Sequence, residues 1–164
     1  MMDVHEAKKK FVEYWGTMSA KWGVPPAMAQ IHALLLASPE PLCANQICDE
    51  LGLSAGSVST NLRDLEQWGL VHRHTQAGRT KDRYTAEKDM WVVVRQIVKN
   101  RKERELDPMF QILDELCELE PACPHSEQLC NTIQDIRKFT HKANDLLNLF
   151  LRNDANWMMR ALVR

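Results

Sequence analysis

The 164 residues include 45% hydrophobic ones and carry a formal net charge of −1, so the chain can form one packed core, and a uniformly basic surface is excluded. No apolar run reaches the roughly 20 residues that a transmembrane helix needs, which excludes a membrane-spanning protein. The five cysteines are an odd number and the first residues lack the apolar segment of a signal peptide, so we expect a cytoplasmic protein with reduced thiols.

Two helices are predicted before residue 42. Large apolar residues recur at steps of three or four from residue 3 to residue 23, which indicates an amphipathic helix. These residues are Phe11, Tyr14, Trp15, Met18 and Trp22. A Gly-Val-Pro-Pro sequence ends this helix, and the second helix, Pro26–Ala37, is so apolar that we expect it inside the core.

A helix-turn-helix is predicted next. Ile47 and Leu51 form the inner face of its first helix, and Gly52 stands where a left-handed C-cap is needed. Ser54 is a suitable N-cap for the second helix, which has apolar residues at helical spacing. The inner face of that second helix consists of Val58, Leu62, Leu65 and Trp68. The spacing as a whole is that of a helix-turn-helix.

A β-hairpin is predicted directly after Gly69. The sequence LVHRHT favours a strand, QAGRTK contains a turn glycine, and DRYTA favours a returning strand. A hairpin that follows a recognition helix is a wing. Residues 70–86 carry four basic residues and one acidic residue, whereas residues 103–120 carry seven acidic residues and one basic residue. One face is therefore expected to attract phosphate and another to repel it.

The chain from Glu87 onward is predicted to be helical, with a boundary at Asp107 and Pro108 and a break at residues 120–124. Beyond the break, apolar positions alternate steps of four and three, as in a seam between helices. This seam consists of Leu129, Ile133, Ile136, Thr140, Ala143, Leu147 and Phe150. An interruption at residues 153–156 precedes a short terminal helix with Trp157 and Leu162.

The predicted fold class is mainly α with a small β-hairpin wing: a winged helix-turn-helix flanked by N- and C-terminal dimerisation helices. Residues 1–24 form an N-terminal helix that joins the dimerisation region. Residues 25–88 form the winged helix-turn-helix DNA-binding domain, and residues 89–164 form a helical dimerisation and possible effector region.

The outward positions of the recognition helix are small or hydroxylic, which lets its backbone approach the major groove, and Arg63 is long enough to reach a phosphate or a base. In the wing, Arg79 stands beside Gly78 and can extend into the minor groove. The predicted DNA-binding residues are Ser54, Ala55, Ser57, Ser59, Thr60, Asn61, Arg63, Arg79, Lys81 and Arg83. Asp82 is a candidate ion-pair partner for Arg79 or Arg83. A solvated surface helix and an ordinary loop are the alternative interpretations.

Two motifs support a family resemblance, GxVSxxLRxLxxWGLV over residues 56–71 and AEKDxW over residues 86–91. With the sequence around them, from Phe11 to Trp91, they resemble the GbsR-like branch of the MarR superfamily. The resemblance implies a homodimeric winged-helix repressor, often one that controls uptake or synthesis of osmoprotectants, with choline or glycine betaine as ligands in some members. It places DNA contacts on residues 54–63 and 79–83.

Five tryptophans raise the question of an aromatic cage, because ring faces attract quaternary ammonium ions. The candidate ligand-binding residues are Tyr14, Trp15, Trp22 and Trp91. Large aromatic residues at helical spacing also occur in cores and dimer interfaces, which is the alternative interpretation.

Four residues around the proline break, Cys117, Cys123, His125 and Cys130, could bind a metal or act as a redox switch. Their spacing is not that of a zinc finger or zinc ribbon, so no metal is predicted. The sequence contains no glycine-rich phosphate loop, nucleophile elbow or catalytic carboxylate pair, so we expect neither an enzyme nor a cofactor.

The predicted function is a sequence-specific transcriptional regulator, a repressor that binds double-stranded DNA as a homodimer on an inverted repeat and responds to an osmoprotectant-type molecule. Two alternatives remain open. One is a redox-sensing winged-helix regulator, and the other is a winged-helix protein-interaction module without an operator of its own, which the near-neutral charge favours.

Overall fold

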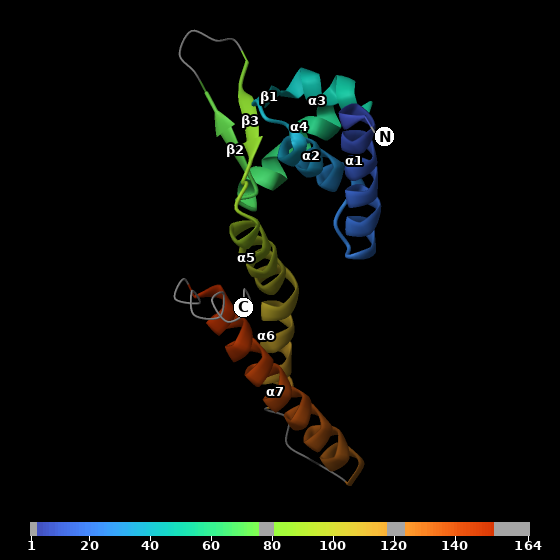
Figure 1. Ribbon diagram of the computed structural model, residues 1–164. Helices are drawn as coiled ribbons and strands as arrows, with labels where there is room; N and C mark the ends of the chain where they lie inside the picture. The colour runs from blue at the N-terminus through green and yellow to red at the C-terminus, as the bar shows by residue number, and fades with distance from the viewer. Residues whose placement is uncertain (1–2, 76–80, 118–123, 153–164) are drawn as a thin grey trace. The chain divides into compact units, whose positions relative to one another are not determined.

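The computed structural model describes residues 3–75, 81–117 and 124–152. The chain divides into two compact units, Met1–Gln96 and Ile97–Arg164. Both consist mainly of helices, and the first also contains a small antiparallel sheet (Figure 1). The predicted fold class, mainly α with a β-hairpin wing, is confirmed. The domain boundaries at residues 24 and 88 remain predictions.

The first two helices, α1 (Val4–Lys21) and α2 (Pro26–Ala37), pack on each other. Ile31 and Ala33 of α2 are fully inaccessible to solvent, which confirms the prediction of a core helix. Pro26 begins α2 because a proline at the first helical position loses no hydrogen bond.

The face of α1 that is buried carries small residues. Val12 and Gly16 are buried, whereas Tyr14 and Trp22 are 68% and 69% exposed. A Cβ atom on Gly16 would lie 2.7 Å from Cγ of Gln30, so a larger residue at this position would displace the Gln30 side chain. The side chains of Tyr14 and Trp22 therefore lie outside the core of the first unit.

The helix-turn-helix follows the sequence prediction. It consists of α3 (Ala44–Leu51) and α4 (Ala55–Gln67). Gly52 has φ = 65° and forms the left-handed C-cap of α3. The Ser54 hydroxyl accepts a hydrogen bond from the Ser57 backbone N–H at 3.2 Å and caps α4. Trp68 forms the C-cap of α4 and is half-buried.

Three of the four apolar positions predicted for the inner face of α4 are buried. They are Val58, Leu62 and Leu65. Together with Ile47 of α3 and the core residues of α2, they form the hydrophobic core of the first unit, and they fix which side of α4 faces solvent.

The sheet contains the predicted hairpin, β2 (Val71–His74) and β3 (Arg83–Ala86), and an additional strand, β1 (Leu42–Cys43). The strand order is β1-β3-β2, and all pairs are antiparallel. β1 was not predicted, because two residues are too short to show the period-two alternation of a strand. The hairpin loop, residues 76–80, lies outside the described residues.

The segment after β3 ties the wing to the rest of the first unit. The Lys88 ammonium donates hydrogen bonds to the carbonyl groups of Leu35 (2.9 Å), Leu36 (2.7 Å) and Ser38 (3.1 Å). These carbonyls lie at the C-terminal end of α2, where the helix dipole is negative, and that of Leu35 also accepts the Ser38 backbone N–H at 3.4 Å. Partial burial lowers the pKa of Lys88.

The neighbours of Lys88 have related roles. The Asp89 carboxylate accepts hydrogen bonds from the backbone N–H groups of Trp91 (2.8 Å) and Val92 (3.3 Å), and so caps the next helix, α5 (Met90–Arg101). The Glu87 carboxylate accepts the N–H of Asp89 at 2.9 Å. In the AEKDxW motif, Lys88 thus binds the end of α2, Asp89 caps α5, and Glu87 accepts the backbone N–H of Asp89.

Replacement of Lys88 with Met is expected to lower the free energy of unfolding by about 1 to 3 kcal/mol, because three carbonyls at the end of α2, two of them in part-buried hydrogen bonds, lose their donor while the side-chain length is kept. Urea unfolding measures the change. Lys99→Met is the matched control, since Lys99 is exposed and lies 4.0 Å from its partner Glu103. Equal stability of the two variants would refute the capping role of Lys88.

The helix after the wing continues through a π-helical turn, η1 (Lys102–Leu106), into α6 (Asp107–Leu116). The predicted boundary at Asp107 coincides with the start of α6, but the chain stays helical there. Pro108 has no N–H to donate, and the Asp107 N–H bonds the carbonyl of Lys102, five residues earlier. The proline therefore changes the hydrogen-bond register without ending the helix.

The last described helix, α7 (Pro124–Leu151), packs on α6. The Asp114 carboxylate accepts a hydrogen bond from Arg137 and lies 3.2 Å from Nε2 of His141. These contacts lower the pKa of Asp114. The Phe110 ring stacks on the His141 ring, with centroids 6.3 Å apart. No helix of the described residues is long and apolar enough to span a membrane.

The predicted seam on α7 divides between two faces. Ile133 and Thr140, seven residues apart, are buried against the rest of the second unit, whereas Leu129 and Ile136 are 56% and 46% exposed. Ala143, Leu147 and Phe150 are half-buried. The predicted terminal helix with Trp157 and Leu162 lies outside the described residues, as does most of the predicted break at residues 120–124.

Candidate nucleic-acid interface

The solvent-facing side of α4 carries the predicted DNA contacts. Ser54, Ala55, Ser59 and Thr60 are exposed, and a Cβ atom on Gly56 would have no neighbour within 4 Å. The N-terminal half of this helix therefore presents small side chains and open space, which suits close approach of a backbone to the floor of a groove.

Two of the predicted residues on α4 have intrahelical contacts. The Asn61 amide donates to the Ser57 carbonyl at 2.8 Å and contacts the Ser57 hydroxyl at 3.4 Å, and both side chains are half-buried. Arg63 is exposed, and within the described part of the chain its guanidinium has no hydrogen bond or ion pair. The donors of Arg63 are thus available to a phosphate or a base.

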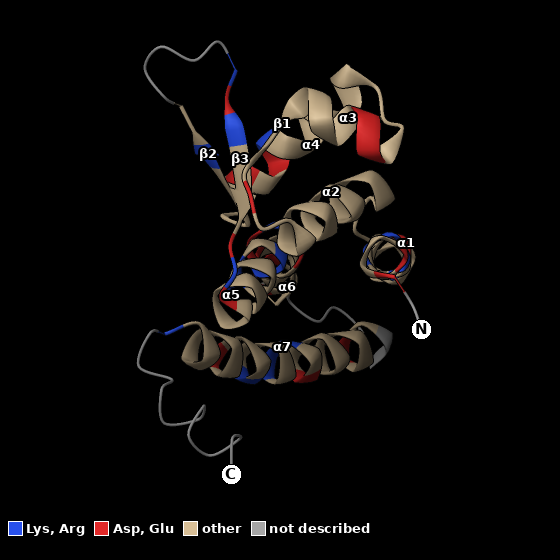
Figure 2. Ribbon diagram, turned by 45° about the horizontal axis from the view of Figure 1, so that its top comes forward, with Lys and Arg blue, Asp and Glu red and all other residues tan. Residues whose placement is uncertain are grey.

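Charge is distributed unevenly around the helix-turn-helix. Figure 2 shows basic residues on both strands of the hairpin and acidic residues on α3. Lys81, at the start of the returning segment, is exposed and has no ion pair among the described residues. A positive hairpin beside a recognition helix has the electrostatic character that phosphate contacts require.

Three residues, Arg73, Thr75 and Asp82, form a clamp that joins the two sides of the hairpin next to its loop. Nε of Arg73 donates to the Asp82 carboxylate at 2.9 Å, and a second guanidinium N–H donates to the same oxygen. The Thr75 hydroxyl donates to the other oxygen at 2.9 Å. Hydrogen bonds from Arg73 and Thr75 lower the pKa of Asp82, so its carboxylate stays charged well below neutral pH.

The partner of Asp82 differs from the sequence prediction, which named Arg79 or Arg83. Successive residues of a strand point to opposite faces, and Arg73 pairs with Tyr84 in the hairpin. Asp82 stands two residues before Tyr84 and thus shares a face with Arg73, whereas Arg83 points to the other face. The signal was the strand alternation, but its use required the register of the hairpin.

Arg83 connects β3 to the segment before β1. Its guanidinium donates to the Pro41 carbonyl at 2.8 Å, and its side chain is half-buried. Part of its hydrogen-bonding capacity is therefore spent within the protein. The predicted minor-groove residue, Arg79, lies outside the described residues, and its DNA contact remains a prediction.

The two histidines of β2 lie on the face opposite Arg73. Nε2 of His72 lies 3.2 Å from the Glu87 carboxylate, and Nε2 of His74 lies 2.8 Å from the Thr85 hydroxyl. These contacts link the two strands through their side chains. In the described ranges no group of three or more His, Cys, Asp or Glu side chains could hold a metal ion.

The cysteine cluster of the redox alternative is partly described. The side chains of Cys117 and Cys130 are half-buried. Cys123 and the side chain of His125 lie outside the described residues. The redox interpretation therefore stays untested.

The four candidate cage residues do not contact one another. Trp15 lies against Phe11, with ring centroids 5.4 Å apart, and no ring contact joins any two of Tyr14, Trp15, Trp22 and Trp91. Trp91 on α5 is 39% exposed. A quaternary ammonium site usually requires several rings around one cation, and the assignment of these four residues to such a site remains a prediction.

Replacement of Asp82 with Asn is expected to weaken DNA binding about tenfold, although it makes the wing more positive. The reason is that Arg73 and Thr75 lose the carboxylate that orients them. Electrostatics alone predicts the opposite sign, tighter binding. Gel-shift titration measures the change, and Asp49→Asn on α3, where Asp49 is exposed, is the control with the same change of charge.

Comparison with known proteins is consistent with this arrangement. Residues 22–80 match the model of the MarR family. The chain has a winged-helix fold, and this segment of it is similar to the MarR family. The matched segment begins directly after α1, includes α2, the helix-turn-helix and β2, and ends before β3.

A solved structure also resembles the chain. It is described as the crystal structure of a transcriptional regulator, with 20% sequence identity, a TM-score of 0.67, and coverage of 88% of this chain and 95% of that chain. At this identity the likeness shows a shared fold and no more. No curated protein matches the sequence significantly.

Proposed function

We propose that the protein is a DNA-binding transcriptional regulator, and that it represses transcription by occluding an operator. The observation that carries the proposal is the exposed side of α4, with small and hydroxylic residues near its N-terminus and the unpaired Arg63, next to a hairpin that the Arg73–Asp82 clamp holds in place. The MarR-family match over residues 22–80 supports it.

The regulator is proposed to act as a homodimer on an inverted repeat. Support comes from α7, whose outward face carries Phe139 at 72% exposure and Leu146 at 69% exposure. Together with Leu129, Ile136 and Leu149 they form an apolar stripe. Such an exposed apolar stripe is unfavourable on a monomer. Two recognition helices related by a two-fold axis match the symmetry of an inverted repeat.

Membership of the GbsR-like branch and a response to choline or glycine betaine belong to the same proposal. Their support is the sequence resemblance described above. Titration of the full-length protein with glycine betaine, followed by tryptophan fluorescence, tests the ligand. A fluorescence signal that saturates is expected, and a flat titration at millimolar ligand would remove this part of the proposal.

Binding to genomic DNA fragments, measured by gel shift at several salt concentrations, tests the DNA proposal. We expect Arg63→Ala to cost about 1 to 3 kcal/mol if it reads a base, and Lys81→Ala to weaken binding to all fragments and reduce the salt dependence by about one ion. Lys10→Ala, on α1, removes the same charge from a surface outside the proposed interface. Absence of binding to any fragment would favour the protein-interaction alternative.

A further inference from the structure

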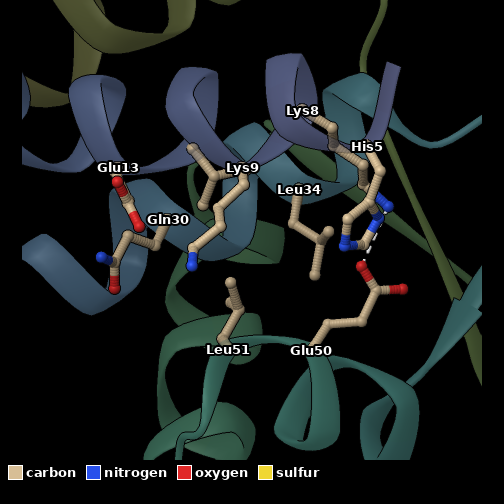
Figure 3. Close-up of a pocket in the computed structure, with 9 residues that line it drawn as sticks. His5, Lys8, Lys9, Glu13, Gln30, Leu34, Glu50 and Leu51 are labelled. Atoms are coloured by element: carbon tan, nitrogen blue, oxygen red, sulfur yellow. Dashed lines mark hydrogen bonds and ion pairs between the residues drawn. The ribbon is translucent and has the colours of Figure 1, made fainter. Parts of the chain in front are cut away.

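A cleft of about 560 Å³ lies between α1, α2 and α3, away from the proposed DNA-binding side of α4. Its volume is within the range of small-molecule sites. Val12 and Leu34, both buried, line it together with the half-buried Leu51. At one end it is bounded by an ion pair across α1 and α3, in which the Lys8 ammonium lies 2.9 Å from the Glu50 carboxylate (Figure 3).

Three polar side chains converge at the other end of the cleft. Figure 3 shows Lys9, Glu13 and Gln30 directed to the same region, beside the apolar surface of Leu34 and Leu51. Within the described residues, none of these three side chains has a hydrogen bond or an ion pair. Lys9 and Glu13 are four residues apart on α1, a spacing at which opposite charges usually attract, yet they do not pair.

The position of Gln30 depends on the packing of α1. Its side-chain stem lies over Gly16, where any Cβ atom would be 2.7 Å from its Cγ. The cleft therefore offers an unpaired ammonium, an unpaired carboxylate and an amide next to an apolar wall. A binding site of this kind combines a largely apolar surface with a few convergent polar groups that orient the ligand.

We propose that this cleft binds a free apolar α-amino acid. The ligand carboxylate pairs with Lys9, its ammonium pairs with Glu13, and Gln30 hydrogen bonds to either group. The apolar side chain of the ligand covers Leu34 and Leu51. An anion or a cation alone would leave one of the two protein charges unpaired, whereas a zwitterion satisfies both with no change in net charge.

Calorimetric titration of the full-length protein with leucine, in the absence of DNA, tests the ligand class. Three analogues each remove one group: 4-methylpentanoate lacks the ammonium, 3-methylbutylamine lacks the carboxylate, and glycine lacks the apolar side chain. Leucine is expected to bind at least about tenfold more tightly than each analogue. No heat of binding with millimolar leucine, or an analogue that binds as tightly, would overturn the proposal.

Two variants test the site. Lys9→Met and Glu13→Gln are each expected to weaken leucine binding by about tenfold or more. Glu13→Gln should not weaken the binding of 4-methylpentanoate, and Lys9→Met should not weaken the binding of 3-methylbutylamine, because each analogue lacks the group that the replaced residue binds and carries the same sign of charge as that residue.

The controls are Lys10→Met and Glu6→Gln. They remove the same charges from the same helix, but Lys10 and Glu6 pair with each other at 2.8 Å and do not line the cleft. Leucine affinity should be unchanged in both. A loss equal to that of the cleft variants would assign the effect to the charge of α1 and refute the site. Because leucine binding is measured without DNA, its failure is distinct from failure of the proposed regulator function.

Discussion

Replacement of both Phe139 and Leu146 with Asp is expected to convert the proposed homodimer into a monomer. Both side chains are more than two-thirds exposed within one chain, so the substitutions remove no contact of the monomer core. Burial of a large apolar side chain contributes about 1.5 to 3 kcal/mol, and a two-fold interface contains each residue twice. We expect dimer dissociation to be favoured at least about 1000-fold, or about 4 kcal/mol.

Sedimentation at micromolar concentration measures the change in mass, and circular dichroism checks that the helices persist. Gln134→Asp is the control, because Gln134 is an exposed residue of the same helix that lies neither on the apolar stripe nor on the buried face. The monomeric variant should also lose high-affinity binding to DNA. It should keep weak binding, because a single winged helix can still contact one half of the inverted repeat. A double variant that still sediments as a dimer would show that other surfaces hold the two copies together.

The second large effect concerns pH and His32. This residue of α2 is 3% exposed, and within the described residues its Nε2 has no hydrogen-bond partner. Burial, with a smaller contribution from the nearby positive charge of Lys88, lowers its pKa from 6.5 to about 4. The native state therefore holds His32 neutral at pH values at which an unfolded chain would protonate it.

The sign of the effect follows from proton binding. Between pH 6.5 and pH 4 the unfolded state binds a proton at His32 that the native state does not, so the free energy of unfolding falls as the pH is lowered through this window. The loss is complete below the native pKa and amounts to about 3 kcal/mol. Above pH 7, His32 is neutral in both states and does not contribute to the pH dependence of the free energy of unfolding.

Urea unfolding of the wild type and of His32→Leu at several pH values measures this effect, because the difference between the two curves removes the contribution of the carboxylates. The difference is expected to change by about 3 kcal/mol between pH 7 and pH 4. His32→Gln, which is polar but does not titrate, should follow the Leu variant in its pH dependence. Parallel curves for wild type and variants would show that His32 protonates in the native state without cost.

The features that the sequence predicted well are those that depend on neighbours along the chain. The C-cap at Gly52 and the N-cap at Ser54 are local requirements of backbone geometry, and the apolar composition of α2 admits no exposed side. The two strands of the hairpin were likewise predicted from the residues within each strand. These elements locate the exposed side of α4, and with it much of the candidate interface.

The features that the sequence did not predict depend on contacts between distant segments. The partner of Asp82 is set by hairpin register, and β1 exists because Leu42 and Cys43 meet β3. Pro108 predicted a boundary, but a shift of hydrogen-bond register by one residue kept the helix continuous. Lys88 was part of a recognisable motif, yet its role requires the end of α2, about fifty residues earlier.

The position of Lys88 has a consequence for the order in which the first unit can be completed during synthesis. The end of α2 is made early, but its carbonyl groups gain their donor only after the wing has been translated and has folded back. A fragment that stops at Ala86 contains every helix and strand up to the end of the hairpin, α1 to β3. It lacks this donor and the Asp89 cap of α5. The smallest segment that folds cooperatively therefore extends into α5, and backbone amides near the end of α2 should exchange with solvent at the same rate as those of the hairpin.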